Sequence, residues 1–174
     1  MLISARAIVY GDDVSTDLII AGKYTKTLNI EELAAHCMED LDPDFLSKCS
    51  DGAIVVAGKY FGCGSSREQA PTALLASGVR CVVAKSFSRI FYRNAVNIGL
   101  PLAECDTSVI QDGDLLEYEL GGGRLLDRST GASLPVTPLN ELMRDILEAG
   151  GMVKIIKTYG GFDRFLKEVG YGGA

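Results

Sequence analysis

Apolar and polar residues alternate in blocks along the first two thirds of the chain. Almost wholly apolar runs, typical of strands buried on both faces of a parallel sheet, occur at residues 2–10, 53–60, 79–85 and 100–105. Between these runs apolar residues recur at helical spacing, which predicts helices at residues 30–41, 67–77 and 86–98. Strands that alternate with helices indicate βαβ units, and therefore an α/β fold with a partly parallel sheet.

Two of these helices carry further signals. Asn29 precedes the first helix as a predicted N-cap, and Pro43 is expected to stop it. In the third helix, Ile90, Phe91 and Ala95 recur on one face and predict the stripe that packs on the core.

The last third of the chain changes character. Residues 114–136 contain two apolar–polar stretches separated by three glycines, Gly121 to Gly123, which predicts an antiparallel excursion with a hairpin turn. A helix is expected to follow, with Thr137 as its N-cap and the glycine pair at 150–151 as its end.

Length and composition fit one folded domain. The chain has 174 residues, of which 47% are hydrophobic and 23% charged, so disordered and fibrous proteins are excluded. Residues 152–159 predict one more strand, and the glycine-rich residues 158–174 predict a peripheral tail. Because no linker or repeat divides the sequence, we expect a single compact domain over residues 1–174.

The formal net charge is −6, which disfavours nucleic acid or an anionic membrane as the main partner. The first apolar stretches are interrupted by Arg6 and by the turn residues 11–13, unlike the continuous core of a signal peptide. No run reaches the roughly 18 apolar residues of a membrane span. We therefore expect a cytoplasmic protein.

The thiols and the one imidazole predict no metal site within this chain. The five cysteines are spread widely and form no CxxC pair: Cys37, Cys49, Cys63, Cys81 and Cys105. Cys81 and Cys105 fit buried strand positions, and Cys63 is interpreted as a small filler of a tight loop, with a reactive thiol as the alternative. His36 lies within a helical pattern and is interpreted as structural.

The stretch most typical of a functional site is the glycine–serine loop that follows the second apolar run. Gly62 and Gly64 permit sharp backbone turns, and Ser65 with Glu68, or Ser66 with Gln69, fits a capping box at the start of a helix. Free N–H groups at a helix start, together with the Arg67 guanidinium, favour a carboxylate or phosphate. The alternative is an ordinary capped helix with Arg67 on the surface.

Three blocks together carry a family resemblance that spans roughly residues 1–150. FGCGSSRE at 61–68, SFSRIFYRNAVNIGLPL at 86–102 and GDDVSTDLII at 11–20 resemble the small subunits of 3-isopropylmalate dehydratases, which are similar to the swivelling domain of the aconitase superfamily. The resemblance implies a swivelling β/β/α domain. It also implies a hydro-lyase subunit of leucine biosynthesis that interconverts 2- and 3-isopropylmalate by dehydration and rehydration.

The family's division of labour implies a partner for this chain. A separate large subunit would carry a [4Fe-4S] cluster and pair with this chain in a heterodimer or heterotetramer, while this chain would bind no cofactor and would be inactive alone. The substrate would be a small hydroxy di- or tricarboxylate. The family commonly has a His where this chain has Gln69.

The resemblance also assigns roles to individual residues. Ser65 matches the serine that, as an alkoxide, removes a proton from the carbon next to a carboxylate, and Asp17 matches an aspartate that pairs with a histidine of the partner. The expected substrate-binding residues are Thr16, Lys26, Gly64, Ser66 and Arg67. An Asx-type turn or helix cap is the alternative role for Asp17.

Lys26 bears on the choice of substrate. It lies in the segment 24–27 that, in the family, contacts the variable substituent, and an ammonium facing an isopropyl group is costly unless it turns away. The main hypothesis is isopropylmalate dehydratase. The alternatives are the small subunit of homoaconitase or of another substituted-malate dehydratase, and a carboxylate-binding module without catalysis.

Overall fold

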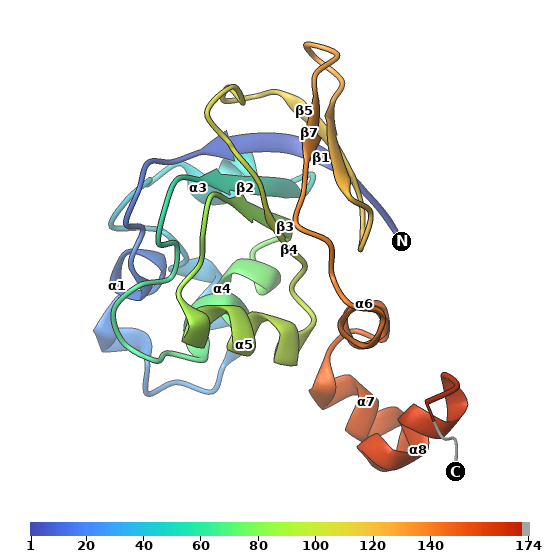
Figure 1. Cartoon of the computed structure of the whole chain (residues 1–174). Coiled ribbons are helices and arrows are strands. Elements are labelled where there is room, and N and C mark those ends of the chain that lie inside the picture. Colours follow the sequence, from blue (N-terminus) through green and yellow to red (C-terminus); the bar gives the residue numbers. More distant parts are fainter. Residues whose placement is uncertain (172–174) are drawn as a thin grey trace.

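The computed structural model describes residues 1–171 of the chain, and within them one mixed sheet organises the fold (Figure 1). Its strands lie in the order β4-β3-β2-β1-β5-β6-β7. Strands β1 to β4 pair in parallel, and β5 to β7 pair antiparallel, with β5 next to β1. The strands are β1 (Leu2–Val9), β2 (Ala53–Ala57), β3 (Val79–Ala84), β4 (Leu102–Glu104), β5 (Leu115–Glu119), β6 (Arg124–Asp127) and β7 (Ser133–Pro135). The predicted α/β class, the parallel half and the antiparallel excursion are confirmed.

The central strands are buried on both faces, as their continuous apolar runs predict. In β2, Val55 and Ala57 pack into a core under the helices, whereas Ile54 and Val56 pack into a second core. The second core lies between the parallel strands and residues of β5, β6 and helix α6, including Leu116, Tyr118 and Leu147.

The helices that connect the parallel strands lie together on one side of them in Figure 1, and α6 to α8 continue the layer beside α5. In chain order, the helical elements are α1 (Thr16–Ile19), the 3₁₀ turn η1 (Gly22–Tyr24), α2 (Ile30–Ala35), α3 (Phe45–Lys48), α4 (Gln69–Ala76), α5 (Arg89–Ile98), α6 (Glu141–Glu148), α7 (Met152–Tyr159) and α8 (Phe162–Glu168). None of the helices in the described part of the chain has the length and hydropathy needed to cross a membrane.

The helix predicted at residues 30–41 is much shorter than expected. The Asn29 cap is confirmed, because its side chain accepts hydrogen bonds from the first turn. The helix nevertheless ends at Ala35, since Met38 adopts a left-handed conformation (φ 61°) and is fully buried. Its N–H donates to the Ile19 carbonyl at 2.8 Å, so a tertiary contact ends the helix before Pro43.

Two predictions about the last third are wrong. The helix expected at Thr137 begins at Glu141, with Asn140 as its N-cap, because the Thr137 N–H is bound to the Glu104 carbonyl beside β4. Residues 152–159 form helix α7 instead of a strand, and the fully buried Ile155 anchors that helix.

The predicted tail and one predicted core residue also differ from expectation. The part of residues 158–174 that the structure describes includes helix α8, whose Phe165 is buried, and residues 172–174 lie outside the described residues. Ile90 is 50% exposed at the start of α5, whereas Phe91 and Ala95 are buried as predicted.

Helices α5 and α7 meet through a glycine contact that tolerates no side chain. Gly99 and Gly151 have φ angles of 83° and 89°, and a Cβ on Gly151 would lie 2.4 Å from the Gly99 nitrogen. We expect Gly151→Ala to destabilise the chain by about 3 kcal/mol, because backbone atoms cannot move aside and the φ angle disfavours any side chain. Thermal unfolding should show a Tm lower by roughly 6–12 °C.

Gly123→Ala is the matched control for that substitution. No atom lies within 4 Å of its added methyl group, and its φ is not in the left-handed region. Its Tm should stay close to that of the unmodified chain. Equal Tm values for the two variants would contradict the close backbone contact.

Candidate functional site

The glycine–serine loop lies at the carboxyl edge of the parallel strands, where α/β folds commonly bind ligands. The segments that follow β1 and β2 pair there. The Gly62 N–H donates to the Val14 carbonyl at 2.8 Å, and the Thr16 N–H donates to the Cys63 carbonyl at 2.8 Å. The GDDVSTD block and the FGCGSS block, about 45 residues apart in sequence, therefore form one structural unit.

The two loop glycines are both required by this geometry. Gly62 has φ 76°, and a Cβ at that position would lie 2.2 Å from the Phe91 ring. Gly64 has φ 95° and faces the Thr16 hydroxyl, to which an added Cβ would approach within 3.4 Å. These values support the prediction that the glycines allow turns that other residues resist.

The predicted capping box does not form. Helix α4 begins at Gln69, and its N-cap Glu68 makes no capping hydrogen bond. The Ser65 carbonyl accepts the Arg67 N–H at 2.8 Å and the Thr16 hydroxyl at 3.0 Å, so the chain turns tightly before the helix starts. That turn leaves the Ser65 side chain exposed.

The polar groups of this turn are free to meet a ligand. Within residues 1–171, the Ser65 hydroxyl makes no hydrogen bond, and neither do the backbone N–H groups of Gly64, Ser65 and Ser66. Ser66 is exposed as well. Unpaired N–H groups beside an exposed hydroxyl are a suitable receptor for an anion and can stabilise an alkoxide.

Arg67 is held in place by groups from the first block. One of its terminal nitrogens, Nη1, contacts the Asp17 carboxylate at 2.5 Å and donates to the Ile20 carbonyl at 3.2 Å. Only 18% of the Arg67 side chain is exposed, against 56% for Asp17. The other terminal nitrogen, Nη2, faces Gly22, where an added Cβ would lie 3.5 Å away. Since Gly22 has no side chain, only its backbone lies beside this part of the fork.

The structure thus brings together Thr16, Asp17, Gly64, Ser65 and Arg67, five of the seven predicted site residues. Ser66 shares their loop, and its side chain makes no hydrogen bond within residues 1–171.

Lys26 is linked to the other predicted site residues only through the backbone of the loop that carries it. The Gln69 side-chain amide donates to the Thr25 carbonyl at 2.9 Å, and this bond ties the segment around Lys26 to the start of α4. The Lys26 side chain is exposed and forms no ion pair within the described residues. The sequence singled out Gln69 only as a departure from the family pattern. The Ile20 carbonyl carried no sequence signal, because every residue has one.

Apart from Cys63, the cysteines lie outside this site. Burial raises the pKa of the Cys37 thiol to about 12 and that of Cys105 to about 11, and it raises the pKa of Cys81 as well. Cys81 and Cys105 are buried as predicted, and Cys63 is half-buried in the loop. No three His, Cys, Asp or Glu side chains among residues 1–171 gather closely enough to hold a metal ion.

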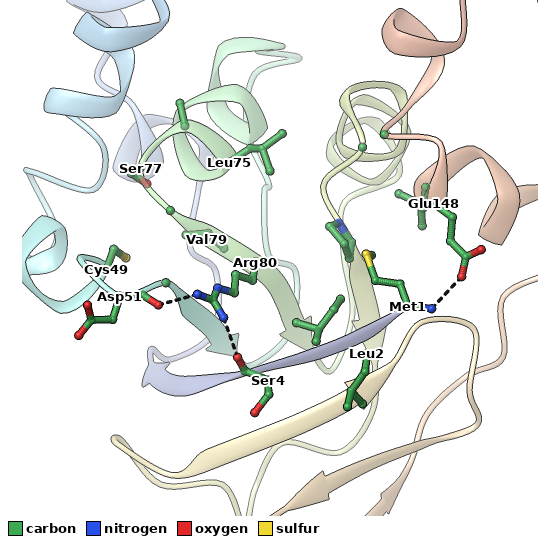
Figure 2. Close-up of a pocket in the computed structure, with 18 of the residues that line it drawn as sticks. Met1, Leu2, Ser4, Cys49, Asp51, Leu75, Ser77, Val79, Arg80 and Glu148 are labelled. Atoms are coloured by element: carbon green, nitrogen blue, oxygen red, sulfur yellow. Dashed lines mark hydrogen bonds and ion pairs between the residues drawn. The ribbon is translucent and has the colours of Figure 1, made fainter. Parts of the chain in front are cut away.

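A hollow with a volume of about 980 Å³ opens at the opposite, amino edge of the parallel strands (Figure 2). Two of the charged side chains that line it, Arg80 and Glu148, already have partners. Arg80 donates to the Ser4 and Asp51 carbonyls at 3.0 and 2.7 Å, and the amino group of Met1 binds Glu148 at 2.9 Å. None of the predicted site residues lines it.

Comparisons with known proteins find similar sequences and a similar structure over most of this chain. The family model described as the aconitase C-terminal domain matches residues 43–104. A 3-isopropylmalate dehydratase small subunit of Halothermothrix orenii is 52% identical, over 90% of this chain and 96% of that protein. Small subunit 1 of Methanopyrus kandleri is also 52% identical, over 91% and 95%. The crystal structure of 3-isopropylmalate dehydratase from Methanocaldococcus jannaschii superimposes with a TM-score of 0.87 at 43% identity, covering 99% of this chain and 100% of that one.

Proposed function

Because the chain belongs to the family of 3-isopropylmalate dehydratase small subunits, a branch of the aconitase superfamily, we propose that its glycine–serine loop supplies the base and the carboxylate-binding arginine of that hydro-lyase. The observation that carries this proposal is the contact of Asp17 with Arg67 beside the free Ser65 hydroxyl. It joins two of the three sequence blocks into one receptor for a carboxylate.

Ser65 acts in this proposal as the base. As an alkoxide it takes the proton from the carbon next to a substrate carboxylate, the electron pair becomes the carbon–carbon double bond, and the hydroxyl of the neighbouring carbon leaves. The free N–H groups of residues 64–66 and the Arg67 guanidinium stabilise the negative charge that develops. Rehydration at the other carbon reverses these steps.

Asp17 and Arg67 act as a pair. Asp17 holds one terminal nitrogen of Arg67, and this fixes the plane of the guanidinium to which the proposal assigns the substrate carboxylate. Asp17 is exposed enough to meet a partner's histidine with its second oxygen, as the family resemblance implies.

The proposed partner is a large subunit that carries a [4Fe-4S] cluster, which, as the family resemblance implies, would bind the substrate hydroxyl. The described residues of this chain do not fit such a cluster, because they hold no grouped ligands. The proposal therefore assigns to this chain the acid–base and carboxylate-binding groups only, and we expect it to work in the cytoplasm.

Lys26 supports a second candidate substrate. Its ammonium is exposed and unpaired among residues 1–171, on a loop tied to the residue that starts α4. Such a charge favours a substituent that ends in a carboxylate, as in the substrates of homoaconitase. Isopropylmalate is the main substrate proposed, because the relatives that cover most of this chain are named for it.

Reconstitution tests the proposal. The purified chain alone should be colourless and inactive, and addition of a cluster-bearing large subunit should produce turnover of 3-isopropylmalate. Assay of the same pair with homocitrate-type acids separates the two substrates. Turnover by the chain alone would contradict the division of labour. Carboxylate binding without turnover in any pairing would indicate a binding module.

A further inference from the structure

The loop that carries Lys26 is held by the same short segment that holds the active-site arginine. Arg67 Nη1 donates to the Ile20 carbonyl at 3.2 Å, and the Gln69 amide donates to the Thr25 carbonyl at 2.9 Å. The side chains of Arg67 and Gln69 therefore bind the two ends of residues 20–25. Gly22, between those ends, lies against the Arg67 guanidinium.

A second set of contacts braces the far side of the loop. The rings of Tyr24 and His36 stack with centroids 3.9 Å apart and an angle of 9° between their planes. Glu39 contacts His36 Nδ1 at 2.6 Å and the Lys23 ammonium at 3.1 Å, so one carboxylate holds both neighbours. These contacts orient Tyr24, the residue before the carbonyl that Gln69 binds.

We propose that Gln69 is a positioning residue for substrate choice, and this inference rests on the proposed function. By holding the Thr25 carbonyl, it sets the distance between the Lys26 loop and Arg67, and so the space open to the variable substituent of the substrate. The substrate carboxylate binds Arg67 directly and is the same in every substrate. Loss of the Gln69 bond should therefore change selectivity between substituents.

Chemistry explains why this position requires a donor. The group that Gln69 meets is a backbone carbonyl, which can only accept a hydrogen bond. A glutamate has nearly the same shape, but it places a negative oxygen against that carbonyl. A histidine has a ring N–H of comparable reach and can restore the bond.

The experiment compares Gln69→Glu with Gln69→His in the complex with the large subunit. For Gln69→Glu we expect kcat/KM for the isopropyl-substituted malate to fall about 10-fold, as loss of a hydrogen bond and a new repulsion predict. The ratio of kcat/KM between isopropyl- and methyl-substituted malates should change by roughly 3-fold or more. Gln69→His should keep both values near those of the unmodified protein.

Trypsin provides a readout that needs no activity. The loop contains Lys23 and Lys26, and cleavage after Lys26 should be faster in Gln69→Glu than in the unmodified chain, because a released loop enters the protease more easily. Gln111→Glu is the matched control. It introduces the same charge at an exposed position outside the site and should change neither cleavage nor selectivity.

The outcomes separate the two hypotheses. If Gln69→Glu lowered kcat/KM equally for the isopropyl- and methyl-substituted malates and left trypsin cleavage unchanged, the proposed role of Gln69 would be overturned. A complex of the unmodified chain that turns over neither malate would overturn the proposed function instead, and the trypsin comparison would still test whether Gln69 holds the loop.

Discussion

Replacement of Ser65 by alanine is expected to lower turnover of 3-isopropylmalate by the reconstituted enzyme about 10³-fold, while the substrate binds within a few-fold of normal. The hydroxyl is the group assigned to take the substrate proton, and no other side chain with an exposed hydroxyl lies in the turn except Ser66. Substrate binding depends mainly on Arg67 and on backbone N–H groups, which the substitution leaves in place. Single-turnover kinetics and equilibrium binding to the complex measure the two quantities separately.

The fold should not contribute to that loss. Because the Ser65 hydroxyl makes no hydrogen bond within the described residues, the variant's Tm should match that of the unmodified chain. Ser50→Ala provides a matched control, since Ser50 is another exposed serine and lies at the opposite edge of the sheet. A Ser65→Ala enzyme that keeps more than a tenth of the normal rate would show that another group is the base.

Arg67→Lys is expected to lower kcat/KM about 100-fold or more, even though the positive charge is kept. The guanidinium meets Asp17, Ile20 and the proposed substrate carboxylate from one plane. A lysine ammonium is a single point with three donors on a flexible stem, so it cannot satisfy those three partners in the same geometry. The loss should appear in KM, because the carboxylate is bound in the ground state, and also in kcat, because the guanidinium is assigned to stabilise the charge that develops.

Arg93→Lys serves as the control for this substitution, because Arg93 is exposed on α5 and has no ion pair among residues 1–171. It should have the activity of the unmodified protein. If Arg67→Lys kept a normal KM, the arginine would not be the carboxylate receptor.

Asp17→Asn should lower kcat/KM less than Arg67→Lys does, since the amide oxygen can still accept a hydrogen bond from the guanidinium.

The order of most helices and strands, and which segments formed each, followed from the local pattern of apolar and turn residues. The runs around Val55 and Val82 are apolar on both faces and lie in the buried parallel strands that such runs predict. Gly121 to Gly123 lie between β5 and β6, as the hairpin prediction requires. These predictions succeeded because burial on both faces and tight turns each leave a mark within a few residues of sequence.

The errors share a different cause. Met38 leaves helical geometry because its N–H reaches the Ile19 carbonyl, and Thr137 stays extended because it pairs with Glu104. The apolar residues of 152–159 suit a strand or a helix equally, and the contact of Gly151 with Gly99 accompanies the helix. In each case the partner lies far away in sequence, where no local pattern describes it.

For the candidate site, the amino-acid order alone predicted the chemistry: a serine, an arginine and an aspartate in blocks shared with a family. Only the folded chain decided their arrangement, since the parallel pairing of the segments after β1 and β2 places Asp17 against Arg67. It also decided that the turn uses the Ser65 carbonyl as a hydrogen-bond acceptor, whereas the Ser65 hydroxyl stays unpaired within the described residues. The physical reason is that residue type is local, whereas which polar atom remains unpaired depends on every neighbour that folding brings to it.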